Sequence, residues 1–154
     1  MIRPATPEDA ATIAAMTRAL SGHVGDLGQH RGSADTLRRD FARFRVLIAE
    51  NGSTASGMVL FFPYYSSLRG EMGLYVQDLF VGANARGTGL GRALLAAAGR
   101  AARDEWDARF LILSAARSNE TALAFYDRLG MAPHDDAVQL SLEGAQFTQL
   151  TETA

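Results

Sequence analysis

The arrangement that most limits the possible folds lies in residues 73–115, where two strand-like runs flank a helix-like run. The strand-like runs are "GLYVQDLFV" and "RFLILSA", both short and apolar. Between them, glycines at alternate positions lead into an alanine- and leucine-rich segment that is typical of a helix. A helix between two strands of one sheet makes them parallel, because the chain must cross back before the second strand begins. We therefore expect a parallel pair of strands.

The rest of the chain predicts further strands and helices around this pair. In order, the patterns indicate a brief strand and a helix in 1–20, a loop in 21–33, a helix in 34–44, a hairpin of strands at 45–50 and 57–65, a helix ending at Gly130 and a last strand at 137–143. We therefore expect an α/β fold: a mixed, mostly antiparallel sheet with a central parallel pair, flanked by helices.

Length, charge and cysteine content exclude several classes of protein. A chain of 154 residues that is 47% hydrophobic fits one globular domain over residues 1–154. A formal charge of −2 gives no general attraction for nucleic acid or an acidic membrane. No apolar run approaches the roughly 20 residues of a membrane span. Without cysteine there are no disulfides, thiolate metal ligands or cysteine nucleophile. We expect a cytoplasmic protein with no nucleic-acid or membrane partner.

The glycine loop does not match two common phosphate-binding motifs. A P-loop needs a lysine, and residues 80–100 contain none. A dinucleotide fingerprint G-x-G-x-x-G fails because its last position falls on Arg92 or Leu94. What remains is the pattern Arg86-x-x-Gly89-x-Gly91 between a strand and a helix, which directs free N–H groups at one spot. The loop can hold a pyrophosphate, or it can be only a tight connection.

Three separate blocks resemble the GNAT superfamily of N-acetyltransferases. "RGTGLG" at 86–91 is similar to its pyrophosphate-loop signature: Arg or Gln, two residues, Gly, one residue, then Gly or Ala. The strand "LYVQDLFV" before it and the later block "SNETALAFYDRLGM" resemble the family as well. The resemblance is sharp over 74–131 and extends in element order from Ile2 to about Val138. It implies that the parallel strands splay at a site for acetyl-coenzyme A (acetyl-CoA), the cosubstrate.

The resemblance also implies which residues bind acetyl-CoA. They are Leu79, Phe80 and Val81 through their backbones, Arg86, Gly87, Thr88, Gly89, Leu90, Gly91 and Arg92 in the loop, and Asn119, Ala122 and Tyr126 in the later block. Leu79, Phe80 and Val81 have side chains of an ordinary core. Asn119 is equally well placed to cap the helix that follows it, and it could do both.

Tyr126 and Asp78 are the candidate catalytic residues. A phenol, with a pKa of about 10, keeps its proton at neutral pH and can protonate a departing thiolate. Tyr126 therefore fits the general acid that the resemblance implies, although it could instead be a half-buried packing residue. Asp78 is a carboxylate within an apolar strand, where burial is expensive unless the group is paired or functional. The alternative is that Asp78 is a structural residue whose carboxylate is paired within the fold.

Within the superfamily, residues 61–81 best resemble the diamine and polyamine acetyltransferases. That branch has a glutamate where this chain has Gln77, so the amine and any proton relay through this position stay open. The resemblance implies transfer to a small primary amine, a diamine, polyamine or lysine-like amine, by direct attack in a ternary complex. The absence of cysteine favours this over an acyl-enzyme. The resemblance also suggests a homodimer formed through the C-terminal strand.

Two other functions are compatible with the same motifs. The chain could bind acetyl-CoA without catalysis, as a sensor or interaction module, or it could acetylate protein N-termini or lysines. The histidines His23, His30 and His134 are scattered without ligand spacing, so we expect surface or loop positions and no metal. No G-x-S-x-G motif occurs, which gives no support for a serine hydrolase.

Overall fold

The computed structural model describes residues 1–23, 30–134 and 138–152. Its strands are β1 (Ile2–Pro4), β2 (Arg45–Asn51), β3 (Thr54–Ser66), β4 (Glu71–Val81) and β5 (Leu111–Leu113). Its α-helices are α1 (Ala10–His23), α2 (Ala34–Asp40), α3 (Leu90–Trp106), α4 (Glu120–Arg128) and α5 (Gly144–Glu152). Short 3-10 turns η1 (Pro7–Asp9), η3 (Phe41–Arg43) and η4 (Ala83–Ala85) complete them. Part of the loop expected at 21–33, residues 24–29, lies outside the described residues.

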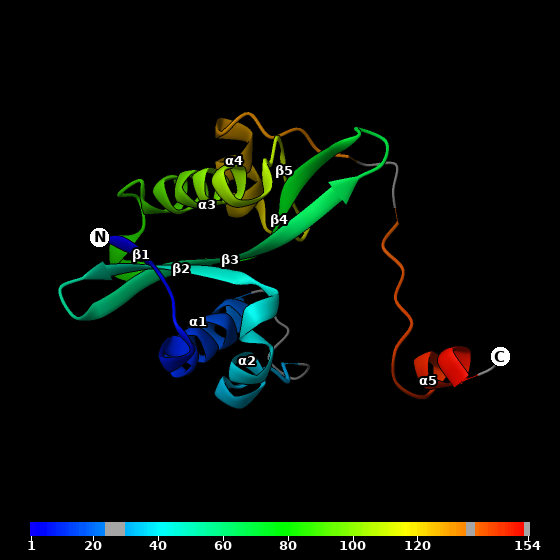
Figure 1. Ribbon diagram of the computed structural model, residues 1–154. Coiled ribbons are helices and arrows are strands. Elements are labelled where there is room, and N and C mark those ends of the chain that lie inside the picture. Colours follow the sequence, from blue (N-terminus) through cyan, green and yellow to red (C-terminus); the bar gives the residue numbers. More distant parts are fainter. Residues whose placement is uncertain (24–29, 135–137, 153–154) are drawn as a thin grey trace.

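The strands form one sheet in the order β1-β2-β3-β4-β5. The first four are antiparallel neighbours, and β4 pairs with β5 in parallel. Helices α1 and α2 cover one face of the sheet and α3 and α4 the other (Figure 1). The expected α/β class with a mixed, mostly antiparallel sheet is confirmed. The parallel pair lies at one edge of the described sheet rather than at its centre.

Each face of the sheet has its own apolar core. On the α1 side, Ile13 and Met16 pack with Ile48 and Met58 of the sheet. On the other side, α3 buries a stripe of side chains at intervals of about four residues, Leu94, Ala98 and Ala102, against strands β2 to β4. This spacing puts them on one face of the helix, as the sequence pattern predicts. The sheet is therefore anchored on both sides of the strands that carry the expected site.

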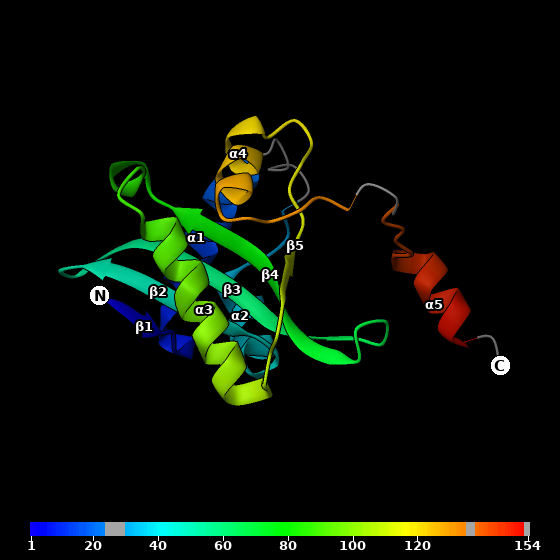
Figure 2. The ribbon, with the colours of Figure 1, turned by 90° about the horizontal axis from the view of Figure 1, so that it is seen from above.

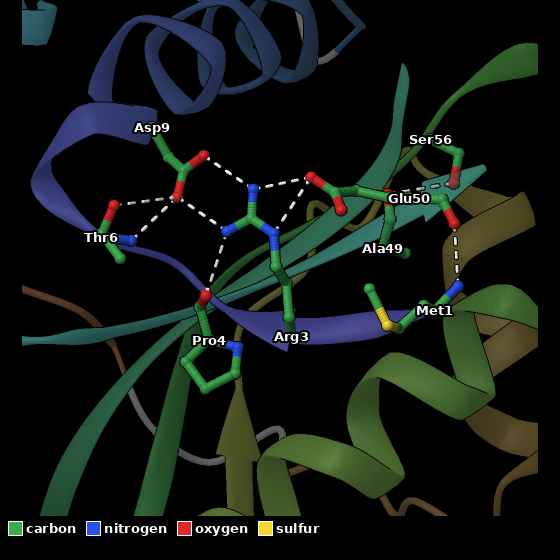
Figure 3. A network of polar contacts seen from close by, with 8 residues as sticks. All are labelled: Met1, Arg3, Pro4, Thr6, Asp9, Ala49, Glu50 and Ser56. Atoms are coloured by element: carbon green, nitrogen blue, oxygen red, sulfur yellow. Dashed lines mark hydrogen bonds and ion pairs between the residues drawn. The ribbon is translucent and has the colours of Figure 1, made fainter. Parts of the chain in front are cut away.

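Arg3 joins the first strand to the first helix and to the neighbouring strand (Figure 3). Its guanidinium donates to both carboxylate oxygens of Asp9 at 2.8 and 2.9 Å, and to Glu50 at 2.6 Å. These contacts lower the pKa of Asp9 to about 2. The same carboxylate accepts the backbone N–H of Thr6 at 2.8 Å, where the chain turns into η1. The network fixes the start of α1 relative to the sheet.

The strand expected at 137–143 is wrong for the part that the structure describes. Residues 138–143 form no strand, and the chain continues into α5. Both ribbon views show this C-terminal segment extending away from the sheet (Figures 1 and 2). Val138 and Leu140 are 83% and 87% exposed. A strand needs a neighbouring edge for its N–H and C=O groups, and no described strand lies beside this segment.

None of the described helices is both long and apolar enough to span a membrane.

Candidate active site

A bulge in β4 decides which side chains reach each face of the sheet. Leu60 pairs with Asp78 whereas its neighbour Phe61 pairs with Val76, so Gln77 is the extra residue. Val76 packs in the α3-side core, and Phe80 packs in the α1-side core. Because directly opposite residues share a face, Asp78 lies with Leu60 on the α1 side. A regular two-residue alternation would instead have put Val76 and Asp78 on one face.

A pocket of about 910 Å³ lies where β4 extends beyond its parallel partner. The pairing with β5 covers Leu74–Val76 only, while β4 continues to Val81. Beyond Val76, no described strand lies on that side of β4. Leu79, Phe80 and Val81 line the pocket along this stretch, which pairs with β3 but is unpaired on the β5 side. The expected splay of the parallel strands therefore coincides with a cavity.

The glycine loop forms one wall of this pocket. Gly87 and Gly89 have φ angles of 76° and 83°, a left-handed conformation that glycine adopts without strain. Gly89 is the N-cap of α3, so the first N–H groups of that helix point out of its end with no partner within the helix. Arg86 and Arg92 line the same wall. Free N–H groups, the positive end of a helix dipole and two cations suit an anion such as a diphosphate.

The first turns of α4 form the facing wall. Asn119 caps this helix by accepting the N–H of Ala122 at 3.1 Å, and both residues line the pocket. Tyr126 is half-buried there, with its ring 5.2 Å from that of Phe125. Burial raises the pKa of the Tyr126 phenol above its ordinary value. The phenol thus keeps its proton over a wide pH range, as a general acid must.

Most of the expected cofactor residues therefore meet in one cavity. Thr88 does not line it; its hydroxyl donates to the carbonyl oxygen of Ala85 at 2.7 Å and closes the loop. Sequence reasoning missed six lining residues, Leu20, Ala85, Thr121, Phe125, Arg128 and Leu129. The last three lie close to Tyr126 on or after α4 and could have been found from helical spacing. Leu20 comes from α1, and only the tertiary fold brings it there.

Asp78 lies next to the pocket without lining it, since Leu79 is the lining residue that follows it. Burial raises the pKa of Asp78 above its ordinary value, and the charge of His30 partly offsets this effect. His134 is exposed as expected. His30 lies in a loop, as expected, and its ring is half-buried and hydrogen-bonded to Ser21.

Asp78→Asn is expected to raise the melting temperature at neutral pH. The pKa of Asp78 is higher in the folded chain than in the unfolded chain, so this group favours folding at low pH and loses that contribution as pH rises through the folded pKa. Thermal unfolding at about pH 7.5 and at about pH 4, near the ordinary aspartate pKa, checks this. The difference between variant and wild type should be larger at the higher pH. An equal difference in melting temperature at the two pH values would show that burying the charged Asp78 carboxylate does not destabilise the fold.

No three His, Cys, Asp or Glu side chains gather as a metal site would within the described ranges.

Comparison with known proteins agrees with this geometry. Residues 16–131 match the acetyltransferase (GNAT) family. The chain belongs to this family, the acetyl-CoA-dependent N-acetyltransferases, as the motif at 86–91 predicts.

Among curated proteins, an L-ornithine N5-acetyltransferase of Arabidopsis thaliana is 33% identical over 86 residues. The match covers 52% of this chain, and the chain spans only 35% of that relative's length.

Solved structures share the fold at low identity. An integron cassette protein from the mobile metagenome of V. cholerae has a TM-score of 0.78 at 19% identity, covering 99% of this chain and 98% of that one. An aminoglycoside acetyltransferase from an uncultured soil sample has a TM-score of 0.75 at 16% identity, covering 93% and 95%. A ribosomal-protein-alanine N-acetyltransferase of Brucella melitensis has a TM-score of 0.70 at 21% identity, covering 92% and 98%.

Proposed function

We propose that this protein transfers the acetyl group of acetyl-CoA to a primary amine of a small molecule by direct attack in a ternary complex. The observation that carries the proposal is the single pocket that joins three parts: the glycine loop, the unpaired end of β4 and the half-buried Tyr126. A diphosphate, an amide-rich arm and a thioester lie in that order along acetyl-CoA. The three parts of the pocket suit them in the same order.

Each part of the pocket has one role in this proposal. The N–H groups at Gly87–Gly91 hold the pyrophosphate, and Arg86, Arg92 and Arg128 balance its charge. The backbone groups of Leu79–Val81 on the side away from β3 bind the pantetheine arm and polarise the acetyl carbonyl, because free N–H groups in a water-poor site stabilise a developing oxyanion. Asn119 and Ala122 complete the wall.

In the chemical step, the neutral amine attacks the acetyl carbonyl carbon as the C–S bond breaks. The departing thiolate needs a proton, and the phenol of Tyr126 supplies it. Burial favours the protonated phenol, which supports this role. No covalent acyl-enzyme is required, since the chain contains no cysteine and the pocket lining offers no activated serine.

The acceptor that we propose is a diamine, polyamine or lysine-like amine. The similarity to an ornithine N5-acetyltransferase, whose name specifies a side-chain amine, supports this class. Asp78 on the α1 face also supports it, because a carboxylate attracts a cationic amine. Of the two residues at 77–78, Asp78 is the acidic one, and Gln77 is exposed at the bulge.

Thiol release from acetyl-CoA, with diamines, lysine analogues, aminoglycosides and short peptides as acceptors, tests the proposal. We expect the highest kcat/KM with a small diamine or lysine-like amine, and intersecting initial-rate lines when both substrates are varied. Preference for a peptide would assign protein acetylation instead. Calorimetric binding of acetyl-CoA without turnover of any amine would assign a binding module.

We also propose that the C-terminal segment 138–152 binds a second copy of the chain. Val138, Leu140 and Leu142 alternate with polar residues and are 83%, 87% and 46% exposed, so one apolar face of the segment has no cover. The outer edge of β5 has no neighbour among the described strands. A strand edge and an alternating apolar segment complement each other. Two copies can satisfy both features reciprocally.

Leu140→Asp is expected to convert a dimer into a monomer, because a charge would be buried at the contact. Size-exclusion chromatography with light scattering at micromolar concentration should show the mass of two chains for wild type and of one for the variant. Leu68→Asp is the matched control, since Leu68 is 95% exposed in the turn between β3 and β4. A wild type that is already monomeric would refute the proposed dimer.

A further inference from the structure

Gly91 lies where three walls of the pocket meet. It belongs to the first turn of α3, directly after the glycine loop. A Cβ at this position would lie 3.2 Å from Cζ of Phe125 on α4 and 3.7 Å from Cγ2 of Val81 at the end of β4. All three residues line the pocket. The bare Cα of Gly91 is therefore the point at which the loop, β4 and α4 come together.

The backbone conformation does not require a glycine at position 91. Gly87 and Gly89 have positive φ angles that suit glycine, but Gly91 lies within α3 without one. In a helix, alanine is more favourable than glycine. The optimal separation of two non-bonded carbon atoms is about 3.5–4.0 Å, so a methyl group 3.2 Å from the Phe125 ring would push that ring away. The missing side chain thus makes room for Phe125.

Phe125 determines how α4 lies against the rest of the fold. Among the residues of α4, all of which the structure describes, none is fully buried. Phe125 and Tyr126 are partly buried and pack against the α3-side core. Their ring centroids are 5.2 Å apart, with the planes inclined by 59°. Because the two residues are adjacent on one helix and their rings are in contact, a displacement of Phe125 moves the Tyr126 phenol with it.

We propose that Gly91 and Phe125 are positioning residues that set where the Tyr126 hydroxyl lies in the pocket. The absence of a side chain at position 91 lets the Phe125 ring lie against the first turn of α3, and this contact fixes α4 and the phenol that it carries. The inference rests on the proposed function, because it concerns the phenol that protonates the thiolate in that reaction. In this role neither residue touches the reacting atoms.

The same geometry separates the roles of two neighbouring glycines. A Cβ at Gly89 would meet nothing within 4 Å, whereas a Cβ at Gly91 would point at Phe125 and Val81. We therefore expect a substitution at Gly89 to act on the affinity for acetyl-CoA and a substitution at Gly91 to act on the chemical step.

Gly91→Ala tests the proposal, because it adds one methyl group and keeps the backbone N–H that the pyrophosphate needs. The rate constant for acetyl transfer to 1,4-diaminobutane, measured in single turnovers with saturating acetyl-CoA, should fall by about tenfold. This is part of the roughly hundredfold loss that a misplacement of about 1 Å can cause. The calorimetric Kd for acetyl-CoA should not change.

Gly99→Ala is the matched control. Gly99 lies in the same helix, and a Cβ there would meet nothing within 4 Å. Both substitutions replace a helical glycine by alanine, so their intrinsic effects on the helix are alike. Gly99→Ala should keep the wild-type rate constant and the wild-type Kd, and a difference between the two variants then comes from the contact with Phe125.

Two combined variants show whether the effect reaches Tyr126. Phe125→Leu removes the end of the ring that includes Cζ, which leaves room for the methyl group of Gly91→Ala. The double variant should therefore transfer the acetyl group faster than Gly91→Ala alone. In a Tyr126→Phe background, Gly91→Ala should cause no further loss, because substitutions that act through one group are not additive.

Several results would overturn the inference while the proposed function stands: a wild-type rate constant for Gly91→Ala, an equal loss in Gly99→Ala, a change in Kd in place of a change in rate, a double variant no faster than Gly91→Ala, or a loss that persists in full without the Tyr126 hydroxyl. A wild type that acetylates no amine would overturn the proposed function and this inference together.

Discussion

Tyr126→Phe is expected to lower turnover by roughly 10²–10⁴-fold, the range typical of losing a general acid. The substitution removes one hydroxyl and keeps the ring that packs against Phe125. No cavity is made, so the melting temperature should stay close to that of wild type. The calorimetric Kd for acetyl-CoA should also change little, because the loop that holds the pyrophosphate is not touched.

The pH dependence gives a second reading of the same variant. The pKa of the phenol is raised by burial, so wild-type kcat should decline only above the ordinary tyrosine value of about 10. The variant should lack this decline. Tyr75→Phe is the matched control, since Tyr75 is another half-buried tyrosine whose hydroxyl lies 2.9 Å from Ser114, outside the pocket lining. If both variants turn over at the wild-type rate, Tyr126 is a packing residue and water protonates the thiolate.

Gly89→Val is expected to weaken acetyl-CoA binding by at least tenfold. Gly89 has a φ of 83°, so a valine there costs about 1–2 kcal/mol of folding stability through backbone strain. A branched side chain at the helix N-terminus would also keep the pyrophosphate away from the N–H groups. Isothermal titration calorimetry with acetyl-CoA measures the change.

Gly52→Val separates strain from binding. Gly52 has a φ of 62° in the turn between β2 and β3, and a Cβ there meets nothing within 4 Å, as at Gly89. Both variants should lose similar stability in thermal unfolding. Only Gly89→Val should weaken acetyl-CoA binding. Equal affinity in the two folded variants would show that the glycine loop connects β4 to α3 without binding acetyl-CoA.

The sequence predicted the elements whose patterns are local. The α3 stripe and the strand on either side of it follow from residues that recur at helical or strand spacing, and the glycine loop carries its own motif. These features determine the parallel pair and hence the place of the pocket. The family resemblance then indicated Asn119 and Tyr126, which the fold brings to that pocket.

The expectations that were wrong depend on the tertiary structure. Residues 138–143 alternate like a strand, but the pattern does not show whether an edge is available to pair with. The bulge at Gln77 breaks the two-residue alternation, so the face of Asp78 could not be predicted from its neighbours.

The most direct test of the proposed function is to follow the acetyl group itself. The protein is incubated with acetyl-CoA that carries a deuterated acetyl group and with L-ornithine or 1,4-diaminobutane, and the amine is analysed by mass spectrometry. The account predicts that the labelled acetyl group appears on the amine nitrogen, in amounts equal to the free thiol released, and that Tyr126→Phe suppresses both. Tight binding of acetyl-CoA with no labelled amine, for these and every other amine offered, would contradict it.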